Sequence, residues 1–235
     1  FLNDEFRKDD TIMHKTKVTE YSLQDVPHYK VHGRTIPGVC PLPLFFNGSA
    51  IEVNVSGSEL WIDIEAGYHV HEIWITCEIN GELMSRQMLM PGRYQLCLFR
   101  GMSEAAVKNV RFTRELQAMT EDEDCYLLIH GLQSDGTFYP VPGKKYTLEF
   151  VGDSITSGEG TYGAKEDTDW IPMYMGYSRN YARMVAEALD ADAYLISQGG
   201  WGVLSSWDAN PHCNIPSRYE MLCGLCCGPV NEKLG

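Results

Sequence analysis

The pattern of apolar residues changes once along this chain, at Pro142-Gly143, and the change limits the folds that are available to it. From about residue 43 up to this point, the sequence consists of short segments that alternate apolar and polar residues or form brief apolar runs, as strands do. We predict strands at 51–55, 59–65, 72–78, 94–99, 107–113 and 125–130. Turn residues supply the corners at Asn80-Gly81, Pro91-Gly92 and Asp135-Gly136. Many strands with almost no helix predict a β-sandwich or a jelly roll.

A different pattern follows residue 144. The run 146–151 has the character of a buried strand, residues Tyr181, Met184, Val185 and Leu189 recur at helical spacing within 178–189, and 193–197 is a second strand. A strand, a crossover helix and another strand form the unit of a parallel sheet. We therefore predict two domains, a β-rich one over 1–143 and an α/β one over 144–235, with a further helix near 216–225.

Polar and glycine-rich residues follow both predicted strands of the α/β domain. Ser154 comes directly after the strand 146–151, and Gly199 and Gly200 come directly after the strand 193–197. Parallel neighbouring strands end at the same edge of a sheet, so one of these glycines is expected beside Ser154. A serine at such an edge can be a nucleophile if a histidine takes its proton and backbone N–H groups face the oxyanion that forms.

The two residues ahead of Ser154 suit this interpretation. Gly152 permits a tight turn and leaves room for a substrate, and Asp153 can order the loop by accepting hydrogen bonds from backbone N–H groups. The alternative is that Asp153 and Ser154 only cap the helix that follows.

The segments Gly152-Asp-Ser-Ile-Thr156 and Gly199-Gly-Trp-Gly202 resemble the first two sequence blocks of the GDSL or SGNH hydrolases. The β-rich domain ahead of them resembles carbohydrate esterase family two, in which a jelly roll precedes the hydrolase domain. The resemblance covers nearly the whole chain and implies a jelly-roll β-sandwich followed by an α/β/α hydrolase domain with a parallel sheet. It also implies a serine esterase that removes acetyl groups from xylan and other acetylated saccharides, through an acyl-enzyme and without a cofactor or metal.

The resemblance also implies roles for particular residues. Ser154 would be the nucleophile, and its own N–H would be one donor to the oxyanion. The second donor would be Gly200, or Gly199, because the alignment of the two glycines is ambiguous by one position. Trp201 would form a wall of the acyl or sugar pocket, unless it packs in the core instead.

Two later blocks of the family, an asparagine in a Gly-x-Asn-Asp-like loop and an Asp-x-x-His, have no counterpart before Gly235. A domain of this kind needs roughly five strands, and only two follow residue 144. We therefore expect the chain to be the front part of a longer protein, with the remainder on a further segment, on a second chain, or absent. His212 is the only histidine after Ser154, and its polar loop predicts a surface or structural role.

Several other groups of residues leave alternatives open. Two histidines, His69 and His71, would share one face of a strand, where they would either bind a metal or face solvent. Thiols at the end of the chain would form half a zinc site or a buried helix face; they are Cys223, Cys226 and Cys227, with His212-Cys213 upstream. Aromatic side chains of the β-rich domain would stack on sugars or pack in its core; they are Trp61, Tyr68, Trp74 and Tyr94. The acidic run 121–124 predicts a solvated loop.

The chain carries 19 basic and 32 acidic residues, a formal net charge of −13. This charge repels phosphate backbones and anionic lipid, so we expect neither a nucleic-acid nor a membrane partner. The start of the sequence is too charged for a signal peptide, and the cysteines inside apolar runs favour a reducing compartment. We expect a cytoplasmic protein, or a secreted one if an upstream signal has been removed.

Two further functions stay open. One is a noncatalytic carbohydrate-binding protein with an incomplete hydrolase half, and the other is a short-chain lipase or acylhydrolase, because the sequence blocks specify acyl transfer and not the leaving group.

Overall fold

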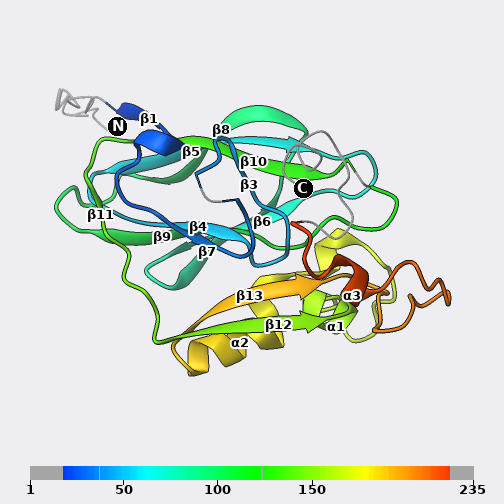
Figure 1. Ribbon diagram of the computed structural model, residues 1–235. Coiled ribbons are helices and arrows are strands. Elements are labelled where there is room, and N and C mark those ends of the chain that lie inside the picture. The colour runs from blue at the N-terminus through cyan, green and yellow to red at the C-terminus, as the bar shows by residue number, and fades with distance from the viewer. Residues whose placement is uncertain (1–17, 37, 123, 223–235) are drawn as a thin grey trace, which may run out of the picture.

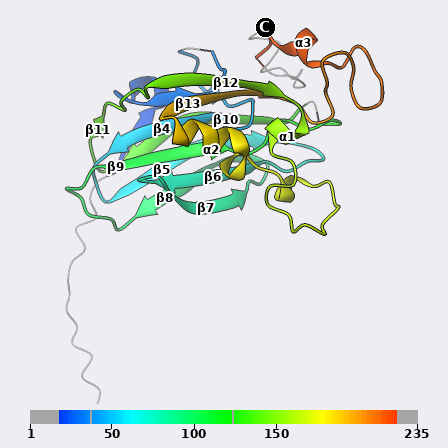
Figure 2. The same ribbon diagram turned by 90° about the horizontal axis from the view of Figure 1, so that it is seen from below.

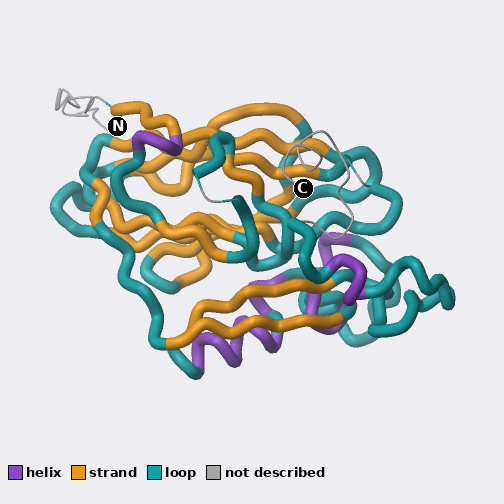
Figure 3. The backbone as a smooth tube through the Cα atoms, in the orientation of Figure 1, coloured by secondary structure: helices purple, strands orange, loops and turns teal. Residues whose placement is uncertain are grey.

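The computed structural model describes residues 18–36, 38–122 and 124–222. Strands dominate it and helices are few and short, as the tube in Figure 3 shows. In Figure 1 two antiparallel sheets lie one above the other, and a parallel pair of strands with a helix lies below them. The chain is therefore rich in sheet, with an all-β region followed by a small α/β unit.

The first antiparallel sheet has the strand order β1-β10-β5-β8, with β3 paired to β10. Its strands are β1 (Thr19–Ser22), β3 (Leu42–Pro43), β5 (Glu59–Gly67), β8 (Gly92–Arg100) and β10 (Tyr126–Ser134). The second sheet has the order β11-β4-β9-β6-β7, with β2 paired to β4. Its strands are β2 (Lys30–His32), β4 (Ala50–Val55), β6 (Trp74–Ile79), β7 (Glu82–Met88), β9 (Lys108–Arg114) and β11 (Phe138–Tyr139). A short 3-10 helix, Leu23–Asp25, follows β1. We call β1 to β11 the two-sheet part.

One apolar core fills the space between the two sheets. Along β5 every second residue is buried, and Ile62 and Ile64 pack against Ile75 of β6 and Phe112 of β9 in the same cluster. This alternation is the pattern from which the strands were predicted, and all six predicted strands are present with bounds that differ by only a few residues.

Strand β7 was not predicted because its sequence carries little periodic signal. It is an edge strand, most of its side chains are exposed, and it depends on its pairing with β6. The Asn80-Gly81 turn that joins the two strands has φ of 54° and 85°, the left-handed values that a tight hairpin turn requires.

The α/β unit consists of β12 (Tyr146–Gly152), β13 (Ala191–Ser197) and the helices α1 (Ser154–Ser157), α2 (Tyr181–Ala188) and α3 (Ile215–Arg218). Two 3-10 helices, Pro172–Tyr174 and Tyr177–Arg179, precede α2. The strands β12 and β13 are parallel, from Tyr146 opposite Ala191 to Gly152 opposite Ser197, as predicted. In Figure 2 these strands and α2 lie in front of the sheets of the two-sheet part.

Helix α2 buries a different face from the one that the sequence predicted. Its small residues Ala182 and Ala186 pack against Leu195 of β13, whereas Met184 is 64% exposed and Val185 is 40% exposed. The predicted helical spacing is correct, but the close approach of helix and strand selects alanines for the contact. The larger apolar residues of the helix are exposed. The predicted helix 216–225 is described only as α3, because residues 223–225 lie outside the described residues.

Polar groups join the two-sheet part to the α/β unit. Lys30 pairs with Asp192 at 2.7 Å, and Arg183 of α2 pairs with Glu78 of β6 at 3.0 Å. Between these pairs His32 is buried and lies 2.6 Å from Glu52.

A second polar contact holds α1. The buried Asn47 side chain donates to the carbonyl oxygens of Thr156 and Ser157 at 3.1 and 3.3 Å, and accepts from the Ser197 hydroxyl at 2.9 Å. This one amide therefore fixes the turn after β12 and the end of β13 against the two-sheet part.

Replacing Asn47 by alanine should lower the free energy of unfolding by about 2–3 kcal/mol, because it leaves buried polar groups without partners. Chemical denaturation measures this change. Asn54→Ala is a matched control, because Asn54 lies on β4 and donates to Pro140 near the surface; its effect should stay below about 1 kcal/mol. Equal effects of the two variants would contradict the role of Asn47.

Acid should destabilise the fold in two steps. Burial, followed by the charge of Arg111, lowers the pKa of His32 below its usual 6.5. Burial alone would raise the pKa of Glu52, but the hydrogen bonds from His32 and Asn109 outweigh it and bring the pKa to about 2. The unfolded state therefore binds more protons at either site, so stability falls as the pH drops below 6.5 and falls again between 4.5 and 2. The urea concentration at the midpoint of unfolding, measured as a function of pH, follows this loss of stability. His32→Gln should flatten the decrease that begins below pH 6.5. If the decrease were unchanged in that variant, His32 would be excluded as its cause.

Candidate active site

Ser154 lies directly after β12, at the start of the short helix α1. The Asp153 carboxylate accepts the Ile155 N–H at 3.1 Å, and Gly158 ends the helix with φ of 86°. Ser154 is half-buried and lines a cavity, so it is not sealed in packing. Asp153 both caps α1 and orders the turn that presents the serine.

Gly152 is required by a close contact rather than by an unusual φ. A Cβ atom at this position would overlap the Thr156 hydroxyl, which is held by a 2.9 Å hydrogen bond with the Tyr181 hydroxyl. The absence of a side chain lets α1 fold back onto the end of β12.

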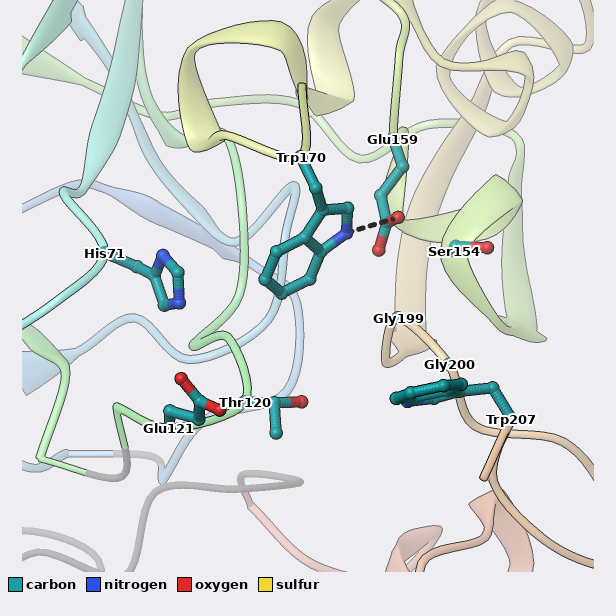
Figure 4. Close-up of a pocket in the computed structure, with 9 residues that line it drawn as sticks. All are labelled: His71, Thr120, Glu121, Ser154, Glu159, Trp170, Gly199, Gly200 and Trp207. Atoms are coloured by element: carbon teal, nitrogen blue, oxygen red, sulfur yellow. Dashed lines mark hydrogen bonds between the residues drawn. The ribbon is translucent and has the colours of Figure 1, made fainter. Parts of the chain in front are cut away.

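The structure brings the glycine segment after β13 to the same cavity as Ser154 (Figure 4). Gly152 and Ser197 pair at the ends of the two strands, and the Gln198 N–H donates to the Gly152 carbonyl at 3.3 Å. Both Gly199 and Gly200 line the cavity, so both stay candidates for the second oxyanion donor. Gly200 has φ of 79°, and a Cβ atom there would overlap the Trp207 ring.

The cavity has a volume of about 600 Å³ and lies between the α/β unit and the two-sheet part. The α/β unit contributes Ser154, Glu159, Trp170, Gly199, Gly200 and Trp207. Loops of the two-sheet part contribute His71, between β5 and β6, and Thr120 and Glu121, between β9 and β10. Neither part forms this cavity by itself.

Trp207, and not Trp201, lines the cavity. Trp201 is 4% exposed, which agrees with the alternative of core packing, whereas Trp207 is 85% exposed. The backbone N–H of Trp207 donates to the Gly200 carbonyl at 2.7 Å, and the Trp207 ring lies against Gly200. The sequence contains both tryptophans, but only the fold of the loop 198–210 decides which of the two rings lines the cavity.

Glu159 and Trp170 form the wall next to Ser154, and the sequence analysis missed both. The indole N–H of Trp170 donates to the Glu159 carboxylate at 2.9 Å. Burial raises the pKa of Glu159 and the charge of Asp153 raises it further, while the bond from Trp170 opposes them. Both residues lie in loops outside every predicted element. Their only signal was an acidic and an aromatic residue close to the Gly-Asp-Ser segment.

The prediction that His69 and His71 share a strand face is wrong, because 68–73 is a loop. The Asp122 carboxylate shapes this loop by accepting the backbone N–H groups of residues 69–71 at 2.8–3.1 Å. Asp122 is buried, so the prediction of a solvated acidic run is wrong for this residue. The His71 ring contacts Trp170 edge to face, with 5.4 Å between the centroids.

The remaining candidates lie away from the cavity. His212 is exposed, as predicted. Tyr68 and Tyr94 pack against the main core, Trp74 stacks under Arg86 and Trp61 donates to Glu59. In the described ranges no three His, Cys, Asp or Glu side chains are grouped as metal ligands. The thiols Cys223, Cys226 and Cys227 lie outside those ranges.

None of the described helices combines the length and the apolar character that crossing a bilayer requires.

Comparison with known proteins relates this arrangement to esterases. No family model matches the sequence. The acetyl xylan esterase Est2A from the rumen bacterium Butyrivibrio proteoclasticus is 52% identical, with a TM-score of 0.87 over 93% of this chain and 59% of that one. A family two carbohydrate esterase from Cellvibrio japonicus is 23% identical and shares the fold, with a TM-score of 0.77 over 90% of this chain and 62% of that one.

A sequence relative, the acetylxylan esterase / glucomannan deacetylase of Cellvibrio japonicus, is 25% identical over 205 residues, 84% of this chain and 54% of that protein. The chain thus spans a little over half the length of these relatives. Over that span, the predicted resemblance to the family two carbohydrate esterases of the SGNH hydrolases is confirmed.

Proposed function

We propose that this chain is part of a serine esterase that removes acetyl groups from acetylated saccharides such as xylan or xylo-oligosaccharides. The observation that carries the proposal is the placement of Ser154 and the two glycines, Gly199 and Gly200, on one cavity at the paired ends of β12 and β13. The 52% identity to an acetyl xylan esterase supports the acyl group and the type of substrate.

In the proposed reaction the Ser154 hydroxyl attacks the acetyl carbonyl, and the sugar leaves as an alcohol. The N–H groups of Ser154 and of Gly200 or Gly199 stabilise the oxyanion, and water then releases acetate from the acyl-enzyme. Both glycines lack a side chain that would keep the substrate carbonyl away from their N–H groups.

We propose that a further segment or a second chain supplies the histidine and the asparagine that the resemblance implies. The apolar side chains on the outer face of the α/β unit support this, since Met184 on α2 and Val151 on β12 are exposed in the described structure. We also propose that the two-sheet part is a jelly roll, that it meets the SGNH-type hydrolase domain near residue 144, and that its loops complete the cavity.

Exposed aromatic side chains support a saccharide as the substrate. Trp207 and Trp170 present large ring surfaces at the cavity, and such rings suit the apolar faces of sugars. The same observation favours the second candidate function, noncatalytic carbohydrate binding, which differs only in lacking the acyl transfer.

Ser154→Ala should lower the kcat for p-nitrophenyl acetate and acetylated xylan at least about a thousandfold, because it removes the nucleophile. The intact gene product is the enzyme to assay. Ser103→Ala, at an exposed position between β8 and β9, should retain full activity. Activity that survives Ser154→Ala would remove Ser154 from the mechanism, and an inactive parent protein would favour the noncatalytic function.

Trp207→Ala should weaken the binding of xylo-oligosaccharides roughly tenfold, the size of one lost aromatic contact, and Trp207→Phe should restore most of the affinity. Isothermal titration calorimetry measures the change. Leu204→Ala is the control, because Leu204 is exposed on the same loop but does not line the cavity. Unchanged affinity in Trp207→Ala would exclude this ring from the saccharide site.

A further inference from the structure

The candidate cavity is lined by acidic side chains from both sides. Glu159 comes from the segment after α1, and Glu121 comes from the loop between β9 and β10. Figure 4 shows the two carboxyl groups on opposite sides, Glu159 near Ser154 and Glu121 near Thr120. No lysine or arginine is among the described residues that line the cavity. Among the described residues, a bound molecule therefore meets two carboxyl groups and one imidazole, that of His71, with no lysine or arginine beside them.

The arginines near the segment 159–176, which carries Glu159 and Trp170, contact other groups than the Glu159 carboxylate. Arg86 stacks on the rings of Trp74 and Tyr162, and donates to the Met175 carbonyl at 2.9 Å. The guanidinium of Arg179 lies 4.6 Å from the centroid of the same Tyr162 ring. These contacts place both guanidinium groups on the Tyr162 ring, and neither arginine forms an ion pair with Glu159.

The position of Glu159 is well defined. One carboxylate oxygen accepts the Trp170 indole N–H, and the other lies against Gly199, where a Cβ atom would overlap it. This second oxygen is next to the glycine segment and can accept a hydrogen bond. A carboxylate only accepts hydrogen bonds, so it suits a sugar hydroxyl and repels another carboxylate.

Glu121 is held in an unfavourable backbone conformation. Its φ is 76°, in the left-handed region that residues other than glycine and asparagine seldom adopt. The next residue, Asp122, fixes the turn through its bonds to residues 69–71, so the surrounding structure imposes this conformation. Strain of this kind persists mainly at functional positions.

We infer that the cavity selects uncharged acetylated saccharides and rejects those that carry a carboxylate, because Glu159 and Glu121 face the ligand from opposite sides. The inference rests on the proposed function in that the cavity receives a saccharide, and it adds the class of saccharide. The net charge of −13 acts in the same direction at longer range.

The test compares two ligands of similar size, xylotetraose and xylotriose that carries one 4-O-methylglucuronic acid. Isothermal titration calorimetry with the full chain should show the acidic ligand binding at least about tenfold more weakly at low salt. The difference should shrink in about 0.5 M salt, because salt screens the repulsion.

The double variant Glu121→Gln with Glu159→Gln should bring the acidic ligand to within about threefold of the neutral one. Glutamine keeps an acceptor oxygen for the Trp170 indole and removes only the charge. Glu82→Gln with Glu104→Gln makes the same change in net charge at exposed positions that do not line the cavity, and should keep the discrimination.

Equal affinity for the two ligands would overturn the inference, as would binding of neither. Discrimination that persists in the cavity variant, or that disappears in the control variant, would also overturn it. Hydrolysis of p-nitrophenyl acetate by the same preparations tests the serine chemistry separately, since that ester carries no sugar. A preparation that discriminates the ligands but does not cleave the ester would support the inference and contradict the proposed esterase.

Discussion

The side chain of Asn47 is the contact on which the site depends. It is 1% exposed and bonds to the carbonyl oxygens of α1 and to Ser197 at the end of β13. Ser197 also accepts the Ser157 hydroxyl at 3.0 Å, so the two strand ends and the two-sheet part share one buried network. Because each group would be left unpaired if another moved, the network holds Ser154 and the glycine segment at a fixed separation.

Polar groups make much of the remaining contact between the two parts. Glu115 of the two-sheet part is buried and bonds to Thr76 and to the Ser178 hydroxyl, and burial raises its pKa. Apolar contacts join the two parts as well, since Ile196 is buried in the main core cluster and Met175 packs with Leu116 and Met119, but such contacts lack the directionality of hydrogen bonds. Directional bonds of this kind fix the orientation of two surfaces more closely than apolar packing does, and a cavity built from both surfaces needs that orientation.

The cavity combines three kinds of group that suit one ligand class. A hydroxyl beside glycine N–H groups suits an ester carbonyl, aromatic rings suit the apolar faces of a sugar, and carboxylates suit its hydroxyls. The ring of Trp207 lies against Gly200, and the ring of Trp170 is held by Glu159, which lies against Gly199, so both walls adjoin the glycine segment.

The sequence by itself determined the strands of the two-sheet part and the meeting of Ser154 with Gly199 and Gly200. Alternation along β5 and the parallel pairing of β12 with β13 depend on residues a few positions apart, and strand ends that follow one crossover meet at one edge. Only the tertiary structure decided that Trp207 replaces Trp201 at the cavity, that α2 buries its alanines, and that His71 and Glu121 face the α/β unit. The placement of His71 and Glu121 depends on the bonds that the Asp122 carboxylate accepts from residues 69–71, which join segments about 50 residues apart and leave no periodic pattern in either one.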